Sequence, residues 1–171
     1  MERYMDAEAR FLHADMLIER GEIAEAKAIL EEIISDEPGY GRAHNHLGWI
    51  IRTSFSDFER AAYHLRLAVK FAPDYPAGYL NYARLLMEVG EFEKMEEVAL
   101  KALEVKGIDR AWATFYLAVA RERTAGLAEG LKTLKVARDA ALDEGTFKFI
   151  SGEIKRVKGR LNPIGRIAML F

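Results

Sequence analysis

The chain has 171 residues, of which 50% are apolar and 30% charged, with a net charge of −2. This length and composition are typical of one soluble globular domain with a substantial core. The small net charge gives no general attraction to nucleic acids or anionic membranes, and the absence of cysteine excludes disulfides and thiolate chemistry. No stretch is apolar enough to span a membrane and no signal-peptide pattern is present, so we expect a cytoplasmic protein.

Apolar residues at helical spacing, interrupted by glycine, proline and short polar breaks, predict eight helices arranged as four pairs. A ninth helix with a clean apolar stripe is predicted near the C-terminus. In chain order the predicted helices span roughly residues 3–20, 22–35, 40–53, 57–71, 76–89, 91–106, 110–124, 127–143 and 146–161.

A four-residue pattern recurs four times with internal steps of four, three and five residues. Successive copies start 35, 34 and 35 residues apart, and each falls in the second helix of a predicted pair. The first helices carry a small residue at a matching interval, at Ala14, Gly48, Ala83 and Ala118. Self-similarity at this period predicts a repeat architecture. The copies are Ala26, Leu30, Ile33, Pro38; Ala61, Leu65, Ala68, Pro73; Met95, Ala99, Ala102, Gly107; and Gly130, Leu134, Ala137, Leu142.

Several turn residues predict where helices begin. Ser56 and Glu59 have the spacing of a capping box at the start of the fourth helix. Asp74 and Asp109 are placed to cap the helices that follow them. The second repeat has one residue more than the others in the turn between its two helices.

The ninth helix, residues 146–161, is predicted to cap the last repeat, because a repeat array must cover its terminal apolar face. Its apolar stripe is Phe147, Ile150, Ile154, Val157 and Leu161, opposite a basic face that would also suit a membrane surface. An apolar tail, residues 162–171, follows. It completes this cap, docks in a groove of the same chain or of a second copy as a homodimer contact, or is disordered.

Charge is uneven along the chain: residues 1–39 carry 11 acids and 4 bases, and residues 144–171 carry 2 acids and 6 bases. This asymmetry either favours head-to-tail contacts between copies or only solvates the two ends.

The pattern resembles the tetratricopeptide repeat, a two-helix unit of about 34 residues. Leu47 and Gly48 with Phe58, Ala61, Leu65, Ala68 and Pro73 follow the pattern closely, as do Tyr82, Ala83, Gly90, Phe92, Ala99 and Ala102. Departures occur in the end repeats, at Arg10, His13, Arg121, Gly130 and Leu142.

The resemblance implies an all-α fold: a right-handed α-solenoid of antiparallel helix pairs in a single domain, residues 1–161. The four repeats are expected at about 7–39, 41–74, 76–108 and 110–143. It also implies a non-catalytic protein-interaction scaffold, adaptor or chaperone-like module that binds a peptide or helix in a concave groove. The lysine and asparagine clamp by which some members bind a chaperone's C-terminal carboxylate is not matched, because no lysine lies in a predicted first helix.

The groove face follows from spacing around the small residue of each first helix. Both tryptophans of the chain fall on it beside three arginines, and such residues often anchor interfaces. The alternative is that these side chains only pack inside the superhelix, and a competing function is binding of RNA or single-stranded nucleic acid by stacking on Trp49 or Trp112. The candidate binding residues are Arg42, Asn45, Trp49, Arg52, Leu80, Arg84, Met87, Trp112 and Phe115.

No cofactor, metal or catalytic group is predicted. His44 and His46 are two residues apart on a helix and point about 200° from each other, so they cannot share one ion. His13 and His64 lie in other predicted helices. No nucleophile motif or glycine-rich phosphate loop is present.

Overall fold

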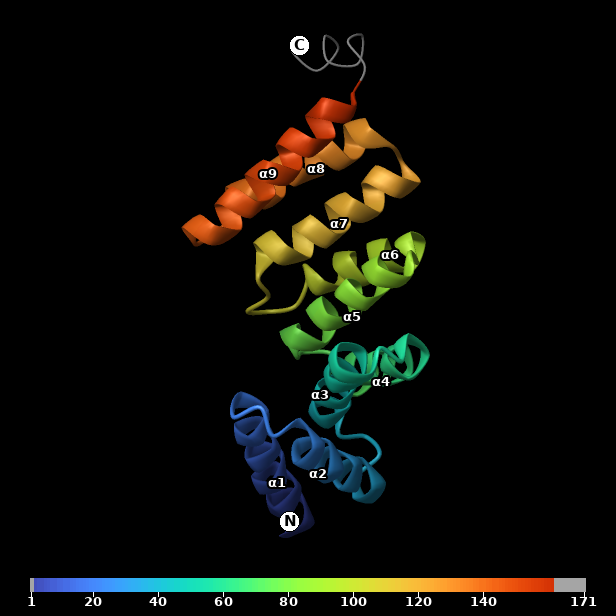
Figure 1. Ribbon diagram of the computed structural model, residues 1–171, viewed down its shortest axis with the longest axis vertical. Coiled ribbons are helices and arrows are strands. Elements are labelled where there is room, and N and C mark those ends of the chain that lie inside the picture. The colour runs from blue at the N-terminus through green and yellow to red at the C-terminus, as the bar shows by residue number, and fades with distance from the viewer. Residues whose placement is uncertain (1, 162–171) are drawn as a thin grey trace. The chain divides into compact units, whose positions relative to one another are not determined.

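The computed structural model describes residues 2–161, with side chains from residue 6 onward, and these residues form helices without any strand (Figure 1). The all-α prediction is therefore confirmed. The helices are α1 (Glu2–Glu19), α2 (Ile23–Asp36), α3 (Gly41–Ile50), α4 (Phe58–Phe71), α5 (Pro76–Val89), α6 (Phe92–Ala102), α7 (Arg110–Thr124), α8 (Leu127–Asp139) and α9 (Glu144–Arg160). A π-helical turn, η1 (Ile51–Phe55), follows α3 directly.

The chain divides into two units, one ending at Leu85 and the other beginning at Leu86, so the boundary lies inside α5. In the first unit α1 packs on α2, α2 on α3, and α3 on α4. In the second unit α6 packs on α7, α7 on α8, and α8 on α9. The single domain of residues 1–161 stays a prediction.

The recurring pattern marks the buried stripe of every second helix. Its first three positions are buried in α2, α4, α6 and α8 alike. The fourth position lies beyond the end of the helix and is exposed in every copy, at Pro38, Pro73, Gly107 and Leu142. The first three positions of the pattern therefore identify the core of each helix pair, and the fourth marks the turn that follows.

The small residues of the first helices sit where two helices approach closely. A Cβ built on Gly48 would lie 2.7 Å from Leu65 Cγ on α4, and one built on Gly41 would lie 2.7 Å from Ala72. In the second unit the close approach is made from the second helix, because a Cβ on Gly130 of α8 would lie 2.7 Å from the Cβ of Glu122 on α7. These distances leave no room for a larger side chain, which explains the small-residue spacing.

The extra residue of the second repeat is absorbed as the π turn η1. The predicted helix 40–53 is α-helical only to Ile50, and the wider turn of residues 51–55 then accommodates the insertion. Two other helices end about four residues earlier than predicted, α6 at Ala102 and α8 at Asp139.

The predicted capping box at Ser56 is wrong. Asp57 is the N-cap of α4, and its carboxylate accepts a hydrogen bond from the Arg60 amide at 3.1 Å. Ser56 instead has a left-handed backbone, with φ of 53°, which reverses the chain after η1. Asp109 caps α7 as predicted, through the Trp112 amide at 3.1 Å.

Helix α9 covers α8 with Ile150, Ile154 and Val157, all of which are buried as predicted. Phe147 does not join this stripe, because it is 47% exposed. The predictions for the tail, including a homodimer contact, concern residues 162–171 and lie outside the described residues. None of the described helices combines the length and apolarity needed to cross a membrane.

Candidate binding face on the first unit

The first helices of the first unit line a cavity of about 240 Å³. Ile18 comes from α1, and Asn45, His46 and Trp49 come from α3. Tyr75 precedes α5, which contributes Ala77 and Asn81. Asn45 and Trp49, predicted separately as groove residues, therefore meet in one concave site.

A pair of asparagine amides links consecutive repeats at this cavity. Asn81 Nδ2 donates to Asn45 Oδ1 at 2.9 Å, and Asn45 is 3% exposed while Asn81 is only partly buried. A carboxamide presents both a donor and an acceptor, as a peptide group does. The Asn45 amide is thus held in place from α5, and Asn81 stands nearer to solvent.

His46 is held between α1 and its own helix. Its Nε2 lies 3.0 Å from Asp15 Oδ1, and its Nδ1 lies 3.1 Å from the carbonyl oxygen of Arg42. The edge of the ring also meets Phe11, with ring centroids 4.8 Å apart. These contacts fix one wall of the cavity.

Tyr75 also lines this cavity. Burial raises the pKa of its phenol above the usual value, with nearby Asp15 acting in the same direction and Arg42 in the opposite one. The phenol therefore keeps its proton at neutral pH and remains a hydrogen-bond donor. Tyr75 and Asn81 are thus neutral polar residues that line the same cavity as the partly buried Trp49.

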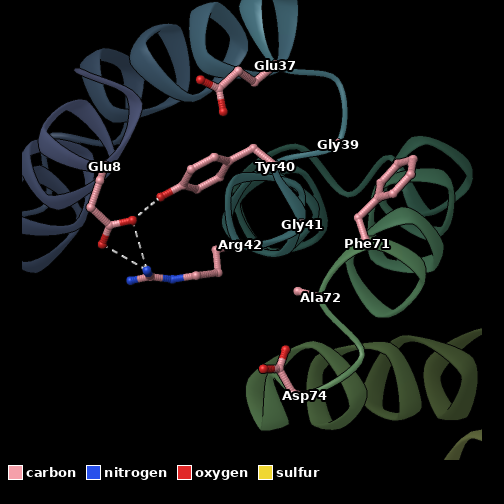
Figure 2. A pocket seen from close by; sticks show the side chains of 9 residues that line it. All are labelled: Glu8, Glu37, Gly39, Tyr40, Gly41, Arg42, Phe71, Ala72 and Asp74. Carbon is pink, nitrogen blue, oxygen red and sulfur yellow. Dashed lines mark hydrogen bonds and ion pairs between the residues drawn. The ribbon is translucent and has the colours of Figure 1, made fainter. Parts of the chain in front are cut away.

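Arg42 is engaged inside the protein rather than presented to a ligand (Figure 2). Its Nη1 donates to both carboxylate oxygens of Glu8, at 2.9 and 3.1 Å, and its guanidinium lies 4.3 Å from the Phe11 ring centroid. Tyr40 also donates to Glu8. The hydrogen bond from Tyr40 and the contact with Arg42 lower the pKa of Glu8 despite its partial burial. Glu8 lies one repeat before Arg42, which is why the two first helices bring them together.

A second cavity of about 460 Å³ adjoins this network (Figure 2). It lies where the loops before α3 and α5 meet the start of α3, and Asp74 and Glu37 stand on its walls. Glu8 is the third carboxylate on its walls, and it already forms an ion pair with Arg42. Its other lining residues are Gly39, Tyr40, Gly41, Phe71 and Ala72.

In the second unit, the predicted groove residues Trp112 and Phe115 are covered by α9. Phe149 of α9 lies against both rings, with centroids 5.3 Å from Trp112 and 5.2 Å from Phe115. Phe115 is only 4% exposed. The packing interpretation therefore describes Phe115, and its prediction as an open groove residue is corrected.

The histidines are placed differently from one another. His44 faces His64 on α4, whereas His46 faces Asp15 on α1, so the predicted divergence of His44 and His46 is observed. Sequence spacing missed the pairing of His44 with His64. Among the described residues, no cluster of three or more histidine, aspartate or glutamate side chains could hold a metal ion.

Three polar residues of the cavity are absent from the predicted binding residues: His46, Tyr75 and Asn81. Two of them carried a signal, because His46 and Asn81 both stand two residues before the small residue of their helix, Gly48 or Ala83. The other predicted residues lie apart from the cavity lining. Arg52 belongs to η1, Leu80 and Arg84 follow Ala77 on α5, and Met87 belongs to the second unit.

A model of the tetratricopeptide repeat matches residues 76–109, from the start of α5 to the N-cap of α7. This match identifies residues 76–109 as a tetratricopeptide repeat, in line with the resemblance seen in the sequence. No curated protein sequence matches it significantly.

Solved structures of tetratricopeptide-repeat proteins have the same fold. PilF of Pseudomonas aeruginosa superposes with a TM-score of 0.78 and 16% identity, over 94% of this chain and 71% of PilF. Yeast Tom70 gives a TM-score of 0.74 and 16% identity, over 96% of this chain and 36% of Tom70. YrrB, a tetratricopeptide-repeat protein described as having an unusual peptide-binding site, gives 0.70 and 13%, over 88% of this chain and 76% of YrrB. At these identities the similarity establishes the fold.

Proposed function

We propose that this tetratricopeptide-repeat chain is a non-catalytic interaction scaffold that binds a peptide segment of a partner protein on the first-helix face of its first unit. The observation that carries the proposal is the cavity at Asn45, Trp49 and Asn81, where a held amide pair stands beside an indole ring. The fold is shared with YrrB, a tetratricopeptide-repeat protein described as having a peptide-binding site, and this supports the same role.

The amide pair suits the backbone of an extended peptide. Because Asn45 uses its oxygen to hold Asn81, the Asn81 oxygen and its second N–H are left to meet a peptide group. Trp49 would contact an apolar side chain of the same peptide. Leu80 and Arg84 share the Ala77 face of α5 by helical spacing, and Arg52 follows Trp49 by one turn, so these residues would extend the site to apolar and acidic groups.

A peptide selection against the full chain tests this proposal. Selected peptides would be titrated while the fluorescence of Trp49 is followed in a Trp112→Phe background. Trp49→Ala and Asn81→Ala should each weaken binding by about 2 kcal/mol, which is roughly thirtyfold, as is typical for central anchors. Tyr63→Ala is the matched control, because Tyr63 is 53% exposed on α4 and lies outside this cavity.

Wild-type affinity in both cavity variants, with unchanged helical circular dichroism, would overturn the site. Selective binding of single-stranded RNA with steep salt dependence would instead favour the nucleic-acid function. No observation on the described residues supports that second function.

A further inference from the structure

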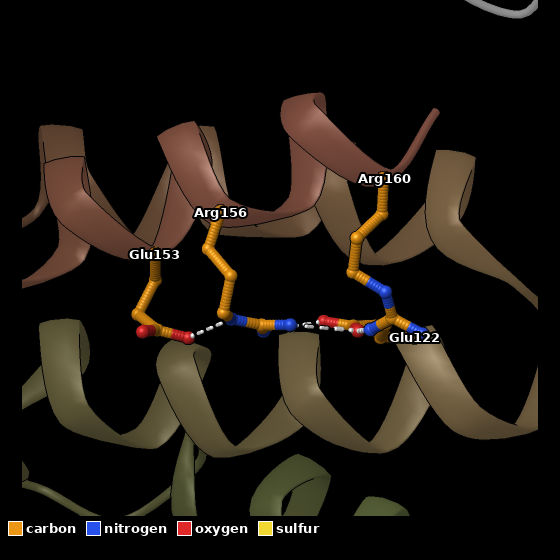
Figure 3. A network of polar contacts seen from close by, with 4 residues as sticks. All are labelled: Glu122, Glu153, Arg156 and Arg160. Carbon is orange, nitrogen blue, oxygen red and sulfur yellow. Dashed lines mark hydrogen bonds and ion pairs between the residues drawn. The ribbon is translucent and has the colours of Figure 1, made fainter. Parts of the chain in front are cut away.

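Helix α9 packs on its neighbour as the first helix of another repeat would. Glu122 on α7 binds Arg156 on α9, 34 residues later, as Glu8 on α1 binds Arg42 on α3, also 34 residues later (Figure 3). The Arg156 Nη2 lies 2.8 Å from Glu122 Oε2. The small-residue interval also continues, because Gly152 follows Ala118 by 34 residues.

The helix-pairing face of α3 recurs on α9. Gly41 and Gly48 are the positions at which α4 approaches α3, through Ala72 and Leu65. Helix α9 has glycines at the equivalent positions: Gly145 follows Gly41 by 104 residues, and Gly152 follows Gly48 by the same interval.

Within the described part of the second unit, no other helix contacts the two glycines of this α9 face. No described atom lies within 4 Å of a Cβ built on Gly152, and the first contact of one built on Gly145 is Asp143 Oδ1 at 3.1 Å. Lys148 and Lys155, on the same side, are exposed, and Lys148 forms an ion pair with Glu144 at 2.6 Å. The α9 face therefore has glycines at its centre and a net positive charge from Lys155. Its open centre suits a large apolar side chain such as the leucine that Gly48 receives.

Helix α1 carries the complementary face. Leu12 and Met16 stand one turn apart and are 51% and 48% exposed. Glu19 follows Met16 by about one turn and is an exposed acid, whereas Asp6 is exposed but forms an ion pair with Arg10 at 3.2 Å. Their setting is acidic overall, since residues 1–39 carry seven more acids than bases. The α1 face therefore presents large apolar side chains in an acidic setting.

We propose that α1 of a second copy of this chain docks on α9, with Leu12 and Met16 packed on the open surface between Gly145 and Gly152 and with Glu19 of α1 beside Lys155. The complementarity of size and of charge selects this occupant, because two α9 faces would bring like charges together. Such a contact is heterologous, so each copy keeps one free face and the assembly grows head to tail. It uses neither Trp49 nor Asn81, and it is separate from the proposed peptide site.

The test measures mass against concentration by sedimentation, from micromolar to submillimolar protein, with the full chain. We expect reversible growth beyond a dimer that weakens as salt is raised. Leu12→Arg, which blocks the α1 face, and Gly152→Trp, which blocks the α9 face, should each weaken self-association at least about tenfold. Val136→Arg on α8, where Val136 is 59% exposed, should leave it unchanged.

Mixing the two blocked variants decides the geometry. The Leu12→Arg chain retains its α9 face and the Gly152→Trp chain retains its α1 face, so the mixture should form a one-to-one dimer that grows no further. A monomeric wild-type chain at all concentrations would overturn the proposal, as would a mixture without heterodimer. A lower melting temperature of Gly152→Trp without any change in mass behaviour would show that another part of the same chain covers α9, and this too would overturn it.

Discussion

His44 and His64 face each other through their Nδ1 atoms, which lie 3.0 Å apart between α3 and α4. His44 Nε2 lies 3.0 Å from the Pro38 carbonyl oxygen, which only accepts, so Nε2 carries the proton of the neutral ring. His44 Nδ1 is then an acceptor, and His64 Nδ1 is the donor. Burial lowers the pKa of both rings, and burial together with the adjacent His44 lowers the pKa of His64 to about 4.

This pair predicts an acid-dependent loss of stability. The unfolded state binds a proton at His64 near pH 6.5 and the folded state only near pH 4, so the unfolded state binds more protons between these values. The free energy of unfolding should fall as pH falls through this range, by up to about 3 kcal/mol from His64. Besides His44, the charges acting on His64 are Arg60, Lys27 and Glu31, and only Glu31 opposes the shift.

Urea unfolding at pH 7 and pH 4.5 checks this expectation. His64→Asn keeps an N–H donor for His44 and removes the titration, so its stability should depend less on pH than that of the wild type. His13→Asn is the control, because His13 is exposed. An equal change in the free energy of unfolding between pH 7 and pH 4.5 in all three proteins would contradict the interpretation of the pair.

Gly41 and Gly152 should respond oppositely to the same substitution. Gly41→Ala places a Cβ 2.7 Å from the backbone nitrogen of Ala72, which cannot move aside, and should cost about 1–3 kcal/mol. Gly152→Ala meets open space inside a helix and should stabilise by up to about 1 kcal/mol. Thermal unfolding at low protein concentration measures both, and a shift of the same sign would refute the close approach of α3 and α4.

Glu122 should control the docking of α9. Its side chain is 2% exposed and is bound by Arg156 and Arg160, and its pKa is lowered by these arginines despite the opposing effect of burial (Figure 3). Glu122→Ala should cost about 1–3 kcal/mol, because both arginines lose their partner but remain partly hydrated. Hydrogen exchange should accelerate mainly in α9.

Glu153→Ala provides the control for this experiment, since it also removes a carboxylate that binds Arg156, at 2.8 Å, but from within α9 itself. It should leave the exchange of α9 close to that of the wild type. Uniform acceleration across α6–α9 in the Glu122 variant would mean that Glu122 stabilises the whole unit rather than this contact.

The start of α4 distinguishes two capping schemes. Asp57→Ala removes the acceptor for the Arg60 amide and should cost about 1 kcal/mol. Ser56→Ala should change stability by less than about 0.5 kcal/mol, because Asp57 rather than Ser56 caps α4. Equal losses in melting experiments would restore the capping box at Ser56.

The amino-acid sequence by itself determined the helices and their buried stripes. The interval between Ala14, Gly48, Ala83 and Ala118, and the pattern at Ala61, Leu65 and Ala68, are local and periodic properties. Each position repeats the same environment, so one helix pair predicts the next. The same regularity predicted Asn45 and Trp49 on one face of α3.

Only the tertiary structure decided which polar and aromatic side chains already have partners. Arg42 and Phe115 have the residue types of binding anchors, but Glu8 and Phe149, in other helices, occupy them. The joining of Asn81 to Asn45 and of His44 to His64 likewise depends on how far one helix is rotated against another. Sequence spacing defines the face of a single helix, whereas a hydrogen bond or ring contact between helices depends on the distance and rotation that packing of both cores imposes.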